Sequence, residues 1–226
     1  ISAVSFDKEL PENNIVTIQP DSLRILHNPL TGWVLYASMG VDAADFWAQY
    51  DHMYIPELGH NVSVTAYAHT LYIRASWTDF NPQEDVYGWK IDSNLRAYIE
   101  GAYQRNMRLA FRVVVDSRDK RTEFTPQFVK DAGAKGFMNK GKWSPYSDDS
   151  VFQKYYTKFV KALAKDFNDP SKVEFIDGFG LGKWGEYHTM IYSTGDDTPK
   201  KAVFDWVTDI YSQAFDKVPV VINYHR

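Results

Sequence analysis

The chain has 226 residues, enough for one large domain or part of a bigger one. It is 44% hydrophobic and 24% charged, and its formal net charge of −4 includes no basic block, so a nucleic acid is not an expected partner. No apolar run approaches the length of a membrane helix. The absence of cysteine excludes disulfides, thiolate metal sites and cysteine nucleophiles.

The N-terminal region differs from the rest of the chain. Residues 1–32 are polar and contain Pro11, Pro20 and Pro29, so we expect a lead-in segment there and a folded domain over 33–226. The first residue is Ile1 and no signal peptide is present. This favours removal of a secretory signal and a periplasmic or extracellular location of bacterial type.

Apolar runs and helical patterns alternate along the folded domain. In chain order we expect strand Trp33–Tyr36, helix Ala43–Met53, strand Leu71–Arg74, helix Ile91–Arg105, strand Arg108–Val115, helix Val151–Phe167, strand Val173–Phe179, helix Pro199–Phe215 and strand Val218–Tyr224. Asn106 can close the second helix in the left-handed conformation, and Thr198 is the expected N-cap of the last one.

This alternation predicts an α/β fold with a parallel sheet and right-handed crossovers. An open nucleotide-binding sheet usually carries a glycine-rich turn after its first strand, but residues 36–40 match neither that turn nor a P-loop. We therefore predict a (β/α)8 TIM barrel. Eight units at this spacing would need a far longer chain, so we expect only its N-terminal part, about five strands.

Side-chain alternation places two arginines on one face of the sheet. In the third strand Phe111 faces the helices and Arg112 faces the opposite way, and in the second strand Ile73 and Arg74 divide in the same manner. Buried arginines need carboxylate partners. The pair predicts either a structural ion network or a cationic floor that orients a catalytic carboxylate or a substrate.

The segment 177–189 leaves the fourth strand through small residues and places Glu186 between Trp184 and His188. Barrel enzymes carry their catalytic groups at this end of the strands. Glycosidic cleavage needs one carboxylic acid to protonate the leaving oxygen and a second carboxylate to attack or to activate water. Flanking rings disfavour the charged form of an acid, as a general acid near neutral pH requires. The alternation leaves the direction of Asp177 open.

Several segments now carry a family resemblance. Tyr72–Trp77, followed by Asn81–Glu84 and Tyr87–Trp89, resembles the second-strand region of retaining (β/α)8 glycoside hydrolases of the β-galactosidase and cellulase superfamily. In that family a strand arginine precedes a tryptophan, a short Glu-Pro-like turn and a Gly-x-x-Trp-like segment. Gly182–His188 resembles the acid/base segment of bacterial members with little characterisation, and Asn28–Trp33 resembles the start of their first strand.

The resemblance covers roughly residues 28–226 and implies hydrolysis of O-glycosidic bonds in an oligo- or polysaccharide, with retention and without a cofactor. It implies that Glu186 is the general acid/base, that Arg74 supports the nucleophile, and that Trp77 and Trp184 are sugar platforms. The family's nucleophile follows the seventh strand, outside this chain, so we expect the chain alone to be inactive. Further candidates for substrate binding are Arg112, Asp116 and His188.

The sequence also departs from the family. Many members have Asn directly before the acid/base Glu, whereas this chain has Gly185. The usual contact with the sugar 2-hydroxyl is therefore in doubt, and His188 is the candidate to replace it.

Other interpretations remain open. The main alternative is a non-catalytic barrel that binds carbohydrate, and a weaker one is a metal-dependent hydrolase using Asp116 with Asp119 and histidines. No His-x-x-x-His pair occurs, so we expect no metal, and no Gly-x-Ser-x-Gly elbow supports a serine nucleophile. Two structural interpretations also stay open: Glu186 as a helix N-terminal carboxylate or salt-bridge partner, and Trp77, Trp89 and Trp184 as core residues. We expect residues 116–150 to form either a wall of the substrate cleft or an insertion without a role in binding. The sequence does not indicate the oligomeric state.

Overall fold

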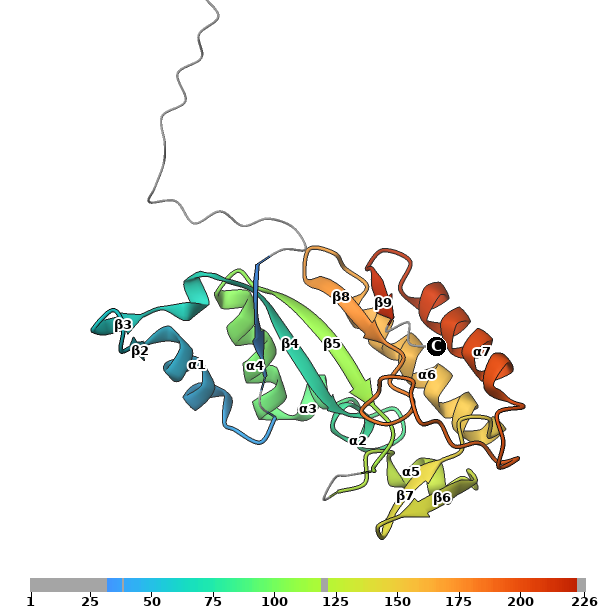
Figure 1. Ribbon diagram of the computed structural model, residues 1–226. Coiled ribbons are helices and arrows are strands. Elements are labelled where there is room, and N and C mark those ends of the chain that lie inside the picture. Colours follow the sequence, from blue (N-terminus) through green and yellow to red (C-terminus); the bar gives the residue numbers. More distant parts are fainter. Residues whose placement is uncertain (1–31, 38, 119–121, 223–226) are drawn as a thin grey trace, which may run out of the picture.

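The computed structural model describes residues 32–37, 39–118 and 122–222. Its centre is a five-stranded sheet in which every pair of neighbouring strands is parallel (Figure 1). In sheet order the strands are β1 (Trp33–Tyr36), β4 (Ala68–Ser76), β5 (Arg108–Val114), β8 (Val173–Gly178) and β9 (Val220–Ile222). Each strand of the sheet lies beside the preceding one in the chain, so the spatial order of the strands is the same as their order in the sequence. This is the progression of a barrel, not of a doubly wound sheet.

Four longer helices connect these strands, and short elements fill the remaining connections. The longer helices are α1 (Ala43–Asp51), α4 (Ser93–Gln104), α6 (Ser150–Phe167) and α7 (Lys200–Ala214). The shorter elements are the hairpin β2 (Met53–Ile55) and β3 (His60–Val62), η1 (Val64–Ala66), α2 (Trp77–Phe80), α3 (Gly88–Ile91), α5 (Gln127–Asp131) and the hairpin β6 (Gly136–Asn139) and β7 (Lys142–Pro145).

The helices cover one face of the sheet and leave the other open (Figure 1). On the covered face Leu71, Ile73 and Phe111 are fully buried, and the Phe111 ring lies 4.7 Å from that of Phe167 in α6. On the open face Tyr36 is 52% exposed. The burial of one set of side chains and the exposure of the other confirm the expected side-chain alternation. Within the described residues, the sheet resembles part of a barrel wall with helices on its outer face and none on its inner face.

Aspartate caps explain where three of the four longer helices, α1, α4 and α6, begin. The side chain of Asp92 accepts the backbone N–H of Leu95 at 2.7 Å, and that of Asp149 accepts the N–H of Phe152 at 2.9 Å. These bonds satisfy donors that have no partner within the helix. Asn106 ends the α4 region with a φ of 57°, in the left-handed conformation that the sequence predicts.

Some boundaries correct the sequence predictions. Thr198 is not the N-cap of α7, because the helix begins at Lys200 and Pro199 occupies the cap position without a side-chain cap bond. The first helix ends at Asp51, since Met53 pairs within the β2–β3 hairpin. Apart from Gly32, the expected lead-in lies outside the described residues, as does the end of the last expected strand. Among the described helices, none has both the length and the apolar character to cross a bilayer.

Candidate functional site

The two inward arginines lie side by side on the open face of the sheet. Arg74 of β4 and Arg112 of β5 are register partners. Arg112 donates through Nε and Nη2 to Oδ2 of Asp177, at 2.9 and 2.6 Å. Its remaining nitrogen, Nη1, donates to Oε1 of Glu186 at 2.8 Å. The guanidinium of Arg112 therefore connects the carboxyl end of strand β8 with the loop that follows it.

Tyr72 completes this cluster from β4. Its hydroxyl donates to Oδ2 of Asp177 at 2.6 Å, and its ring lies 5.4 Å from that of Tyr36 on β1. Burial, together with the hydrogen bond and charge of Asp177, raises the pKa of Tyr72 well above its usual range. The hydroxyl therefore remains a hydrogen-bond donor throughout the physiological range.

The electrostatic state of Arg112 follows from the same neighbours. Burial lowers its pKa, but the side chains around it, Tyr72 and Asp177 foremost, offset that effect and raise the pKa overall. The side chains of Arg112 and Asp177 are 14% and 13% exposed. At such burial, removing Asp177 would leave Glu186 as the one acidic contact of Arg112 among the described residues.

Arg74 has a different environment. Its Nη2 donates to the backbone carbonyl of Trp184 at 3.1 Å, and its Nε is buried without a hydrogen-bond partner. Within the described part of the chain, no carboxylate contacts this guanidinium. Arg74 therefore lines the cavity with a positive charge that no carboxylate of the described residues contacts.

The loop that carries Glu186 has a tight turn whose conformation depends on glycine. Gly185 has a φ of +75°, and a Cβ at this position would lie 3.2 Å from the carbonyl oxygen of Val113. The Asn that the family resemblance leads one to expect is therefore disfavoured here on both steric and backbone grounds. The turn exposes Trp184, whose side chain is 41% accessible to solvent.

A cavity of about 280 Å³ connects these groups at the carboxyl end of the strands. It is lined by Tyr36, Tyr72, Arg74, Arg112, Trp184 and Glu186. His188 borders it: the imidazole Nε2 lies 3.7 Å from Oε2 of Glu186, and the ring lies 5.4 Å from that of Trp184. Four residues predicted from the sequence thus share one cavity, and His188 stands beside it.

Two predicted residues lie elsewhere. Trp77 is fully buried in α2, with its ring 5.2 Å from Tyr156 and 5.7 Å from Phe159 of α6, so it presents no face to a sugar. Asp116 is 7% exposed and pairs with Arg118, whose Nε donates to it at 2.7 Å. Both are structural residues, which corrects the roles expected for them.

Two described residues of the insertion, Arg118 and Ser144, contact Asp116. The Asp116 carboxylate also accepts the hydroxyl of Ser144 in β7 at 3.3 Å, and so ties the β6–β7 hairpin to the end of β5. Trp143 of the same hairpin is 6% exposed. Asp119, the other half of the expected metal pair, lies outside the described residues. Within the described ranges, no three His, Asp or Glu side chains gather closely enough to hold a metal ion.

Sequence reasoning did not assign Tyr36, Tyr72 or Asp177 to the site. Tyr72 could have been found, because it shares the inward face of its strand with Arg74. Asp177 could not, because the register of β8 shifts against β5: Leu109 pairs with Val173, but Ala110 pairs with Phe175. This bulge reverses the side-chain alternation.

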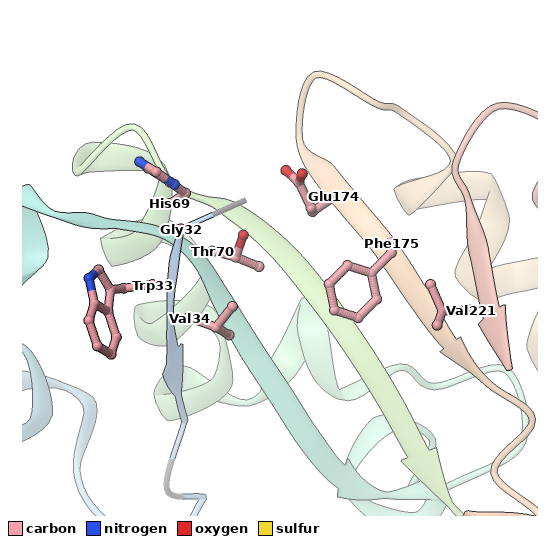
Figure 2. Close-up of a pocket in the computed structure, with 8 residues that line it drawn as sticks. All are labelled: Gly32, Trp33, Val34, His69, Thr70, Glu174, Phe175 and Val221. Carbon is pink, nitrogen blue, oxygen red and sulfur yellow. The ribbon is translucent and has the colours of Figure 1, made fainter. Parts of the chain in front are cut away.

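A second cavity, of about 340 Å³, lies on the same open face at the opposite end of the strands. Figure 2 shows Val34, Phe175 and Val221 spread across this region of the sheet from β1, β8 and β9. Its charged member, Glu174, is ion-paired with Arg108. Because barrel enzymes act at the carboxyl end of their strands, we place the candidate site at the Glu186 cavity.

Comparison with known proteins shows the fold. No family model and no curated protein matches the chain. Its structure is similar to that of GH5_18 from Streptomyces cattleya in complex with GlcNAc, with 13% identity, a TM-score of 0.53 and coverage of 84% of this chain and 43% of that one. It is also similar to endo-glycoceramidase II from Rhodococcus sp., with 14% identity, a TM-score of 0.51 and coverage of 84% and 48%.

The chain therefore spans less than half the length of either structure. Its five parallel strands and flanking helices correspond to part of the barrel of these glycosidases. The resemblance to (β/α)8 glycoside hydrolases is thus confirmed at the level of the fold.

Proposed function

We propose that the chain is part of a glycoside hydrolase that cleaves the O-glycosidic bonds of an oligo- or polysaccharide, with Glu186 as general acid/base. The observation that carries this proposal is the shared cavity, in which a carboxyl group and the exposed ring of Trp184 meet at the carboxyl end of parallel strands. The carboxyl group can protonate a leaving oxygen. An indole face packs against the apolar face of a pyranose.

The second carboxylate is not Asp177. Two-carboxylate glycosidases place their groups on opposite sides of the scissile bond. Asp177 and Glu186 instead bind neighbouring edges of one guanidinium, that of Arg112, and so lie on the same side of the cavity. We assign the nucleophile to a segment outside the described residues, where the positive charge of Arg74 in the cavity lining would attract it.

Replacing Glu186 by Gln in the full-length protein tests the assignment. General acid assistance matters most when the leaving group is a poor one. We therefore expect kcat/KM to fall by about 10²–10⁴-fold on an unactivated oligosaccharide and to change little on a 2,4-dinitrophenyl glycoside, whose aglycone departs without a proton. The measurement is the initial rate on both substrates, with Glu57→Gln on the exposed β2–β3 turn as the matched control.

Wild-type rates of Glu186→Gln on the unactivated substrate would remove the assignment. An equal loss on both substrates would contradict the acid role as well, because it would indicate damage to the site and not the loss of a proton donor.

A barrel that binds carbohydrate without cleaving it is the second candidate function. It is favoured by the absence of a carboxylate facing Glu186 across the cavity among the described residues. Under this reading Trp184→Ala abolishes oligosaccharide binding measured by calorimetry. The control Trp33→Ala, an exposed tryptophan on the other cavity, leaves binding unchanged. Binding without hydrolysis by the full-length wild type would decide for this function.

A further inference from the structure

A problem of charge arises once Glu186 is taken as a general acid. The acid must hold a proton during part of the cycle, yet its Oε1 lies 2.8 Å from Nη1 of Arg112. A guanidinium at hydrogen-bond distance stabilises a carboxylate anion and opposes its protonation. Some other group must therefore offset the charge of Arg112 if the proposed chemistry is to work.

Asp177 is placed to do this. Among the described residues, the side-chain hydrogen bonds of Asp177 fall on one oxygen: Oδ2 accepts from Tyr72 at 2.6 Å and from Nε and Nη2 of Arg112 at 2.9 and 2.6 Å. The two bonds from Arg112 prevent the guanidinium plane from rotating, and the tyrosine bond prevents the carboxylate from turning away. Only Nη1 is left over, and it is the nitrogen that meets Glu186.

We propose that Asp177 is a positioning residue for Glu186, acting through Arg112. With Tyr72 it fixes the orientation of the guanidinium and neutralises part of its positive charge, so that Glu186 has a defined position and can still be protonated. This inference rests on the proposed glycosidase function. It assigns Asp177 no contact with the substrate.

The groups around Glu186 leave Asp177 as the main counter-charge. The Glu186 carboxylate contacts Nη1 of Arg112 at 2.8 Å, and Nε2 of His188 lies 3.7 Å from it. Within the described chain, Asp177 and Glu186 are the two acidic residues that contact Arg112. Among the described residues, the titratable groups that line the cavity are Tyr36 from β1, Tyr72 and Arg74 from β4, Arg112 from β5 and Glu186 from the loop. Asp177 from β8 and His188 from the loop contact this set, and Lys183 lies over the ring of Trp184.

The test is the pH dependence of kcat/KM in the full-length Asp177→Asn variant. Loss of the aspartate charge leaves Glu186 as the remaining acidic contact of Arg112 in the described chain, which stabilises the Glu186 anion. This effect moves the alkaline limb of the profile to lower pH, by about one pH unit. The control Asp209→Asn, on the exposed surface of α7, leaves the limb where the wild type has it.

A second variant tests whether the effect passes through Arg112. In the double variant Arg112→Gln with Asp177→Asn, both members of the buried pair are neutral, so Glu186 no longer faces the Arg112 charge. We expect the acid displacement of the alkaline limb to disappear. This variant also keeps the test available if Asp177→Asn alone fails to fold, because Arg112→Gln with and without Asp177→Asn can then be compared.

An unmoved alkaline limb in Asp177→Asn would overturn the proposal, even if the rate and the melting temperature both fell, because those losses alone indicate a structural role. If the full-length wild type cleaves no glycoside, the proposed function fails and the positioning role is tested separately. A 13C-NMR titration of glutamate-labelled protein, with the Glu186 signal identified by its loss in Glu186→Gln, then supplies the readout. A midpoint that Asp177→Asn shifts to lower pH supports the proposal, and an unchanged midpoint refutes it.

Discussion

A pair of buried tyrosines connects the core to the loop that carries Glu186. Tyr156 donates its hydroxyl to the carbonyl of Phe179 at 2.8 Å, and its oxygen is 2.8 Å from the hydroxyl of Tyr211. Both tyrosines are essentially inaccessible to solvent, and burial raises the pKa of each. Since Tyr156 uses its one proton on Phe179, Tyr211 donates to Tyr156, and the two hydroxyls anchor the exit from β8.

At this residue scale we expect Tyr156→Phe to lower the free energy of unfolding by about 1–3 kcal/mol, because it leaves a buried carbonyl and a buried hydroxyl without partners. Urea denaturation of the full-length protein measures the change. The control Tyr54→Phe, on a side chain that is 59% exposed, should have little effect. Equal stability of the two variants would show that the Phe179 carbonyl finds another donor.

At the scale of elements, the Tyr87–Trp89 motif that supports the family resemblance is a packing device. Trp89 is 7% exposed, and its indole N–H donates to the Asp166 carboxylate in α6 at 2.8 Å. Gly88 lets α3 approach α2 so closely that a Cβ there would overlap the carbonyl oxygen of Asp79. The motif therefore sets how α3 packs on α2 and α6, and it lies away from the cavity.

We expect Gly88→Ala to destabilise the full-length protein by about 1–3 kcal/mol, since the backbone of α2 cannot yield as a flexible side chain would. Gly40→Ala is the matched control, because a Cβ at Gly40 has no neighbour within 4 Å. Thermal unfolding followed by circular dichroism compares the two. A Gly88→Ala melting temperature equal to that of Gly40→Ala would contradict the close approach.

At the scale of the whole molecule, the open face and the two edge strands are the exposed features. Trp33 and Tyr36 of β1 are 75% and 52% exposed, and Val221 and Ile222 of β9 are 48% and 39% exposed. Edge strands with unpaired backbone groups and apolar side chains pair readily with other chains. In a closed barrel these groups would be covered.

We therefore expect the 226-residue chain, produced by itself, to self-associate. Light scattering coupled to gel filtration should give a mass that rises with protein concentration. Val34→Lys on the open face of β1 should reduce the association, whereas Val41→Lys, an exposed valine outside the sheet, should not. A monomer at every concentration would contradict this expectation.

The sequence by itself determined the order of elements and the faces of β4 and β5. Those faces follow from strict alternation in uninterrupted strands, which is why Arg74 and Arg112 were placed correctly on one surface. Glu186 could likewise be located from the chain alone, because small residues after an apolar run mark a strand's carboxyl end. These features depend on local periodicity, which can be recognised in the sequence without knowing which segments lie beside it in the fold.

Only the tertiary structure decided what depends on register and depth. The bulge between β5 and β8 turns Asp177 toward Arg112, and no local sequence pattern predicts this bulge. Trp77 follows the strand as a sugar platform would, yet the start of α2 carries it into the aromatic core beside α6. A one-residue shift reverses a strand's faces, and a helix start redirects a side chain. Both are set by contacts between segments far apart in the chain.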